Sequence, residues 1–338
     1  MKQETIKLNL FDEKNSKIES LMRIQLDNYS QEEAPYIVSE ITKHIILKNN
    51  LIEDNNLKKI ENFYQGKTNC LILDGCFPTQ GLPPTPTNDR PPPINTWKIQ
   101  ASMLIALMSL TNHKVASYQG EMNGRLSHMV MPSNNNSYSH SRSTKPLLPH
   151  TEVIHGFFPE EIENLNNGAS IIPHIFGLAA LKNPNKASTN FWSIEDILNE
   201  IPYQILLDLM KPEYNAISQS SFDVKYKNNN MPVIYSSKAG LIIRFSYNKL
   251  VPTTSKAENA LNILKEHLNN QKYMTSISLQ PGQILLVNNR NTLHGRERLK
   301  TKALFDGHDR WLIRMYGFTY DAWRMLSRSR TTPHIAIN

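Results

Sequence analysis

The first residues whose types and spacing could do chemistry together are His150 and Glu152, in the sequence His150-Thr151-Glu152. On a strand, residues two apart point to the same face, so this imidazole and this carboxylate could both face one ion. The chain has 11 histidines and 30 acids, so about one such pair is expected by chance. A lone histidine is also more often structural than a ligand. The pair therefore indicates a metal site only if a third ligand joins it.

His294 is the candidate third ligand, because it lies shortly after the apolar run 284–288, which predicts a buried strand. A histidine from a distant strand would complete a site of two histidines and one carboxylate. Such a site leaves positions open on Fe(II) for a cosubstrate and dioxygen. Imidazole and carboxylate also suit zinc, so a hydrolytic zinc site is an alternative. The lack of a His-Glu-x-x-His helix weighs against it.

Arg310 and Arg314 are the second chemical signal. The apolar residues around them predict a strand over 311–317, on which residues four apart share a face. If that face is buried, two guanidinium groups require anions, and the planar guanidinium matches a carboxylate in two hydrogen bonds. A dicarboxylate cosubstrate and a carboxylate-bearing substrate would supply them. The alternative is ion pairing inside the protein, with Asp306, Asp309 or Asp321.

These residues need a scaffold, and the first part of the chain predicts helices. We expect the first sixty residues to be helical, with Ser30 as an N-cap, and a second helix capped by Asn95-Thr96. The prolines between 78 and 93 predict an irregular loop. Two later helices are predicted from sequences resembling capping boxes, at 193–196 and from Ser255 onward.

Beyond residue 117 the pattern changes to short strands separated by turns. Pro281-Gly282 suits a type II turn before the strand 284–288. Many short strands with helices outside predict a mixed α/β fold with a jelly-roll or double-stranded β-helix core. The strands are expected at 125–131, 171–181, 241–246, 284–288 and 311–317.

Length and composition predict a globular protein and disfavour several other classes. The 338 residues, 39% apolar, can bury a large core. No apolar run is long enough to span a bilayer, the N-terminal sequence is unlike a signal peptide, and two cysteines make no disulfide framework. We therefore expect a cytoplasmic protein without membrane contact. The net charge of +7 comes from scattered basic residues, which disfavours nucleic acid as a partner.

Four stretches together resemble a known family, the clavaminate synthase-like branch of the Fe(II)/2-oxoglutarate-dependent oxygenases, with taurine dioxygenase as a more distant relative. Their order and spacing match over roughly residues 65–320. The branch includes free amino-acid hydroxylases that act on arginine, asparagine and lysine. The stretches are residues 81–86, 150–152, 288–296 and 306–314.

The resemblance implies a role for each site residue. His150, Glu152 and His294 would bind Fe(II), and Arg310 with Thr189 would hold the far carboxylate of 2-oxoglutarate. Two further residues would bind the substrate: Arg314 its α-carboxylate, and Glu121 its amino group or side chain.

The chain also departs from its relatives. Between Glu152 and Thr189 it is longer, and Phe157 and Phe158 in this insertion could line a differently shaped pocket or belong to the core. Relatives that take basic amino acids carry acids where this chain has Ser246 and Asn248, which puts arginine and lysine in doubt as substrates. The asparagines 134–136 are a hypothetical lid or an idle exposed loop.

The resemblance implies one oxygenase domain over 1–338, with a helical part at 1–64 and the double-stranded β-helix core at 65–325. The expected activity is hydroxylation of a small free amino acid by Fe(II), 2-oxoglutarate and O2, with release of succinate and CO2, in secondary metabolism. Glu152 favours hydroxylation over halogenation. The alternatives are a peptidyl or carrier-bound substrate, desaturation, and a metal-free β-helix binding module.

Overall fold

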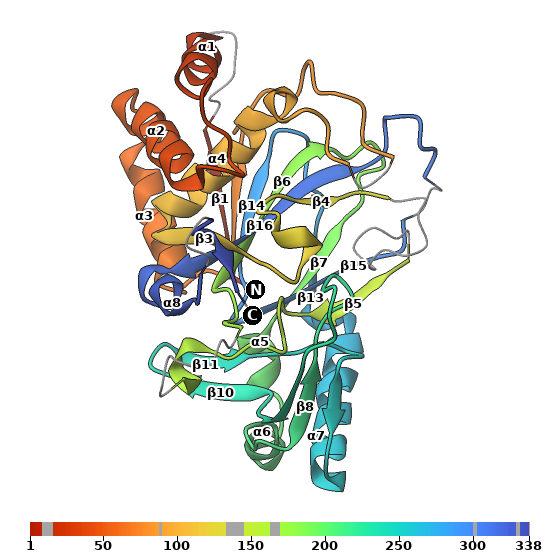
Figure 1. The fold of residues 1–338 in the computed structure, drawn as a ribbon. Helices are drawn as coiled ribbons and strands as arrows, with labels where there is room; N and C mark the ends of the chain where they lie inside the picture. Colours follow the sequence, from red (N-terminus) through yellow and green to blue (C-terminus); the bar gives the residue numbers. More distant parts are fainter. Residues whose placement is uncertain are drawn as a thin grey trace.

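The largest element of the computed structural model is an eight-stranded sheet (Figure 1). The structure describes residues 1–8, 16–87, 90–132, 145–162, 170–299, 303–328 and 332–337, so the asparagines 134–136 lie outside the described residues. Seven strands follow one another across the sheet, and β4 (His128–Val130) pairs with β16 beside them. The order is β1 (Gln3–Lys7), β2 (Cys70–Asp74), β14 (Ile284–Asn288), β6 (Ile175–Lys182), β16 (Trp311–Thr319), β3 (His113–Tyr118) and β17 (Ile335–Ala336).

A second sheet of four strands shares a core with the first. Phe191 and Ile277 from this sheet pack with Phe176 and Leu178 of β6 and with Leu312 of β16. The main sheet therefore buries one face against the second sheet. The four strands are, in order, β13 (Met274–Ile277), β7 (Thr189–Ser193), β15 (Thr292–Arg296) and β5 (Leu147–His150).

The opposite face of the main sheet packs against helices. Successive side chains of each strand point alternately to the helices and to the second sheet. In β16, Ile313 and Met315 pack toward the helices, whereas Leu312 and Tyr316 pack toward the second sheet. A Cβ on Gly177 would lie 2.6 Å from Leu104 Cδ1, so glycine lets the central helix lie close to the sheet. The helices of this layer are α1 (Ser16–Gln25), α2 (Pro35–Lys48), α3 (Asp54–Tyr64) and the buried α4 (Lys98–Leu110).

Residues 194–273 form a further module with its own apolar cluster, seen at the bottom of Figure 1. The module lies in the chain between β7 and β13, and its strands form two small sheets of their own. Its elements are α5 (Ile194–Leu198), α6 (Tyr203–Leu209), β8 (Tyr214–Ile217), β9 (Lys227–Met231), β10 (Ile234–Ser237), β11 (Gly240–Ile243), β12 (Leu250–Pro252) and α7 (Ser255–Asn269). The short α8 (Tyr320–Met325) follows β16.

The mixed α/β class is confirmed, and several predicted elements have corrected bounds. The strand over 284–288 is as predicted, and Gly282 has the positive φ of 91° that a type II turn requires. The other four predicted strands occur with shifted ends, as β4, β6, β11 and β16. The prediction of a wholly helical start is wrong, because residues 3–7 pair in parallel with β2.

The predicted helix caps were mostly misplaced. The helix α2 begins at Pro35, and Ser30 instead exchanges hydrogen bonds with Glu33 in a preceding turn. Trp97 rather than Asn95-Thr96 is the N-cap of α4, and the cap of α7 is Thr254, whose side chain accepts from the Ala257 N–H. Ser193 is the N-cap of α5 but makes no side-chain capping bond.

Both cysteines, Cys70 and Cys76, are buried and unbridged. In the part of the chain that the structure describes, no helix is long and apolar enough to cross a membrane.

Candidate functional site

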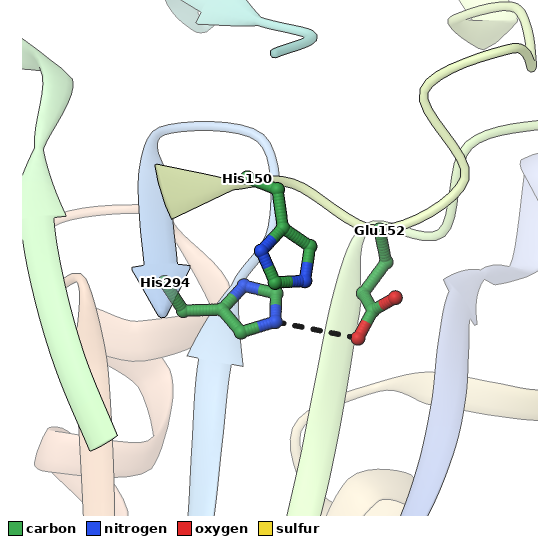
Figure 2. A group of neighbouring side chains, drawn as sticks. All are labelled: His150, Glu152 and His294. Carbon is green, nitrogen blue, oxygen red and sulfur yellow. Dashed lines mark ion pairs between the residues drawn. The ribbon is translucent and has the colours of Figure 1, made fainter. Parts of the chain in front are cut away.

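The structure brings His150, Glu152 and His294 together (Figure 2). His150 on β5 and His294 on β15 are direct partners across the second sheet, and their ring centroids are 4.1 Å apart. His294 Nε2 lies 3.4 Å from Glu152 Oε1. One nitrogen or oxygen from each residue lies within 4.8 Å of the others, which is close enough for all three to bind one metal ion.

Glu152 is not on the strand that carries His150, contrary to the sequence-based expectation. β5 ends at His150, and Glu152 lies in the turn that follows, before the positive φ of Val153. Asn289, directly after β14, fixes this turn. Its Oδ1 accepts from the Glu152 N–H at 2.7 Å, and its amide nitrogen donates to the Glu152 carbonyl at 3.3 Å. The sequence analysis did not identify this role of Asn289. The one local indication of a role is that the residue lies at the end of a predicted strand.

The His150 imidazole presents a nitrogen in the form that binds metals. His150 Nδ1 lies 2.8 Å from the Leu148 carbonyl, an arrangement in which Nδ1–H donates and leaves Nε2 as the lone-pair nitrogen. Burial, with the neighbouring His294 acting in the same direction, lowers the pKa of His150 to about 3. The ring is therefore neutral at physiological pH, as a metal ligand requires.

The Glu152 carboxylate is held as an anion. Arg314 donates to its Oε1 at 2.7 Å, and Gln219 and Tyr316 donate to its Oε2 at 3.3 and 3.2 Å. Burial acts to raise the pKa of Glu152, but the Arg314 guanidinium and His294 lower it well below the usual range. Gln219 is a second residue that the sequence analysis missed.

Arg314 lies between two buried acids. Besides Glu152, it donates to Glu121 Oε1 at 2.9 Å, and the Tyr316 hydroxyl bridges the same two carboxylates. Burial raises the pKa of Glu121 and Arg314 opposes that rise. The alternative of ion pairing inside the protein is therefore confirmed for Arg314, but its partners are Glu121 and Glu152 rather than Asp306, Asp309 or Asp321.

Arg310 has no such partner. Its side chain is 5% exposed and lines the cavity just before β16, and it makes no hydrogen bond or ion pair with any residue that the structure describes. Burial lowers its pKa to about 9, and the cation of Arg296 acts in the same direction. Thr189 pairs with Arg296 across the second sheet and lines the same cavity. A buried unpaired guanidinium and a hydroxyl on the lining of one cavity fit an incoming carboxylate.

The cavity that joins these groups has a volume of about 200 Å³. Ser246 and Asn248 line it, and Ser246 forms an isolated bridge with His150. Phe157 and Phe158 do not line it. Phe158 is buried instead against the guanidinium groups of Arg244 and Arg290, at 4.7 and 5.7 Å from its ring centroid, so the core interpretation of this pair is the correct one.

Comparison with known proteins shows what this chain is similar to. The family model described as taurine catabolism dioxygenase TauD, TfdA family, matches residues 219–316, the segment that carries His294, Arg310 and Arg314. This segment of the chain is therefore similar to the TauD/TfdA family of dioxygenases.

Two individual proteins are similar to the chain in sequence. The chain is 24% identical over 257 residues to the L-lysine 3-hydroxylase of Catenulispora acidiphila, a match covering 73% of this chain and 66% of that protein. It is 30% identical over 114 residues to the L-asparagine oxygenase of Streptomyces coelicolor, covering 33% of this chain and 32% of that protein. The sequence matches thus span less than two thirds of these curated relatives.

Solved structures of similar fold extend over the whole chain. An asparagine oxygenase in complex with Fe(II), 3-hydroxyasparagine and succinate aligns with a TM-score of 0.79 at 20% identity, covering 100% of both chains. The non-haem iron oxygenase OrfP in complex with Fe and 2-oxoglutarate aligns with a TM-score of 0.76 at 18% identity, covering 99% of each chain. At these identities the likeness establishes the fold.

Proposed function

We propose that the protein is an Fe(II)/2-oxoglutarate-dependent dioxygenase that hydroxylates an unactivated C–H bond of a free α-amino acid and releases succinate and CO2. The observation that carries this proposal is the unpaired Arg310, buried at one end of a cavity that contains the His150, Glu152 and His294 cluster. A buried cation without a partner is costly, so its retention there supports an anionic cosubstrate. The two sheets would then be the halves of a double-stranded β-helix, in one oxygenase domain over 1–338 with its core at 65–325.

The residues present fit the metal and the cosubstrate. His150, Glu152 and His294 would hold Fe(II), since two imidazoles and one carboxylate suit it. Arg310 and Thr189 would hold the far carboxylate of 2-oxoglutarate. The bound metal and cosubstrate supply an oxidant able to remove hydrogen from an unactivated carbon. The protein's own contribution is to orient that carbon and to exclude water.

The substrate end of the site supports a free amino acid. Arg314 lines the cavity and offers a guanidinium to an α-carboxylate. Glu121, predicted to contact the substrate's amino group or side chain, is fully buried and does not line the cavity, so its contribution would be to orient Arg314. A peptidyl or carrier-bound residue has no free carboxylate for Arg314. Known relatives are consistent with this choice, because solved structures hold L-Arg in OrfP and 3-hydroxyasparagine in asparagine oxygenase.

The test is succinate formation with Fe(II), 2-oxoglutarate and O2 against a panel of free amino acids. We expect one or a few of them to give succinate together with a product 16 mass units heavier. A product lighter by two hydrogens would indicate desaturation. The proposal fails if no free amino acid stimulates succinate formation, or if zinc in place of Fe(II) supports turnover. A metal-free binding module is excluded if anaerobic addition of Fe(II) and 2-oxoglutarate gives a weak visible charge-transfer band.

For the free-substrate assignment, the informative variant is Arg314→Ala. Turnover of a tethered residue that survives this substitution would favour the peptidyl or carrier-bound alternative.

A further inference from the structure

One wall of the cavity is formed by residues 246–249, which follow β11. The Tyr247 N–H donates to the Pro149 carbonyl at 3.3 Å, and Ser246 is bridged to His150. These backbone contacts fix the wall against the strand that carries a candidate metal ligand. A substrate held with its reacting carbon near His150 therefore meets side chains from this wall.

The charges around the cavity are strongly unbalanced. Four cations line it, Lys249, Arg296, Arg310 and Arg314, and Glu152 is the one carboxylate on the lining that the structure describes. Glu152 and Glu121 together balance Arg314. Arg310 is assigned to the cosubstrate in the proposed function. The wall 246–249 thus contributes a cation and neutral groups to the substrate, but no anion.

Lys249 is the charged residue of this wall. It is partly buried, and its ammonium group makes no ion pair or hydrogen bond within the described parts of the chain. Its backbone is fixed, because its carbonyl accepts from the Ile217 N–H at 2.9 Å and its N–H donates to the Ser246 carbonyl at 3.3 Å. An anchored backbone with an unengaged ammonium group is well placed to donate to a ligand.

Resting on the proposed function, we propose that the substrate is an α-amino acid whose side chain ends in a carboxylate or an amide, and that Lys249 determines this specificity. The ammonium group donates to the side-chain oxygen, and it repels the ammonium or guanidinium group of a basic side chain. In a partly buried cavity the repulsion between Lys249 and a basic side chain is weakly screened. The wall 246–249 also offers no anion that could offset this repulsion.

The experiment measures binding separately from turnover. Isothermal titration of the protein loaded with Fe(II) and 2-oxoglutarate under nitrogen is carried out with aspartate, asparagine, glutamate, glutamine, lysine, ornithine and arginine. We expect the best acidic or amide amino acid to bind at least about tenfold more tightly than any basic one, a difference of about 1.4 kcal/mol. Comparing acids with amides identifies which of the two termini is recognised.

Two substitutions with the same charge change test the role of Lys249. Lys249→Glu is expected to shift the ratio of affinities toward lysine by about tenfold or more. Lys238→Glu, on the exposed turn between β10 and β11 and outside the cavity, should leave the ratio unchanged. The anaerobic charge-transfer band with 2-oxoglutarate shows for each variant that the metal site is still assembled.

The outcomes distinguish the two proposals. Preferred binding and coupled turnover of lysine, ornithine or arginine overturn the substrate class while the proposed function stands. An unchanged ratio in Lys249→Glu overturns the role of Lys249. Absence of succinate with every free amino acid overturns the proposed function itself, and this inference with it.

Discussion

Two arginines that line the cavity differ in whether the protein provides an acidic partner for the guanidinium group. Arg310 and Arg314 are four residues apart, both are largely buried, and both line the same space. Arg314 is held by Glu121 and Glu152, whereas Arg310 has no acidic partner among the described residues. Burial lowers the pKa of Arg310 to about 9, but the flanking carboxylates outweigh burial at Arg314 and raise its pKa.

This difference separates two uses of a buried charge. Around Arg314 the protein supplies both signs itself, so the Glu152 carboxylate is fixed before any ligand binds, and a substrate α-carboxylate would join a network that is already formed. Around Arg310 the protein supplies only the cation, and the ligand must complete the pair. A buried charged group without a partner in the protein is therefore a better indication of a ligand-binding site than burial of the group alone.

The largest expected effect is on stability, in Arg314→Leu. This substitution leaves Glu121 and Glu152 buried without their cation, so we expect the free energy of unfolding to fall by about 3–5 kcal/mol. Urea denaturation followed by circular dichroism measures it. A loss below about 1 kcal/mol would contradict the view that the two acids depend on Arg314.

The matched substitution, Arg310→Leu, should act on binding instead. We expect 2-oxoglutarate to lose about 2–5 kcal/mol of binding free energy, because a buried charge pair loses one partner. The free energy of unfolding without ligand should stay the same or rise, since an uncompensated charge is removed. Anaerobic titration and urea denaturation give the two values. If Arg310→Leu destabilises the protein as much as Arg314→Leu does, the comparison between the two ends is wrong.

An ionisable group outside the cavity provides a reference for pH effects. His113 at the start of β3 is buried, and burial lowers its pKa to about 4, against a weaker opposing contact from Thr111. Its neutral form is favoured in the folded state, so its contribution to stability is complete above pH ~6.5 and is lost as the pH falls toward 4. Between pH 7 and 4.5 the loss is about 2–3 kcal/mol.

The variant His113→Gln should therefore show a flatter pH profile of the free energy of unfolding than the wild type. Urea denaturation at several pH values measures both profiles. Parallel profiles for the wild type and the variant would show that His113 does not titrate as its burial implies. The loss of stability in acid would then come from other groups, including those in the cavity.

The smallest effect is expected for Thr189→Val. Loss of one neutral hydroxyl beside Arg310 should raise the KM for 2-oxoglutarate by a few fold, about 0.5–1.5 kcal/mol, with kcat unchanged. Thr189→Ser keeps the hydroxyl and is the control. A KM equal to that of the wild type would remove Thr189 from the cosubstrate end.

Much of the central sheet could be predicted because its strands carry their own signal. The run 284–287 is continuously apolar, as expected for a strand buried on both faces, and the predicted bounds 284–288 match β14. β1 carries almost no local signal. Only Ile6 of its five residues is buried, and its partner β2 begins at residue 70. Pairing over such a sequence distance is decided by tertiary packing, which no local pattern reports.

The site shows the same limit. Residue type and spacing singled out His150, Glu152 and His294, since few side chains suit a metal, and the structure brings them together. The contacts that orient Glu152 could not be predicted, because Asn289 and Gln219 reach it from 137 and 67 positions away. The sequence-based view of Arg314 also lacked Glu121, whose contact spans 193 positions.

The position of β16 in the sheet has a consequence for the biosynthesis of the protein. Among the main-sheet strands that the structure describes, β16 is the last long one in chain order, yet it lies in the interior of the sheet between β6 and β3. A nascent chain must therefore keep these two neighbours apart, with unpaired edges exposed, until the strand arrives. Since β16 carries Arg314 and follows Arg310 directly, the nascent chain gains both arginines and the strand that joins β6 to β3 in a single step.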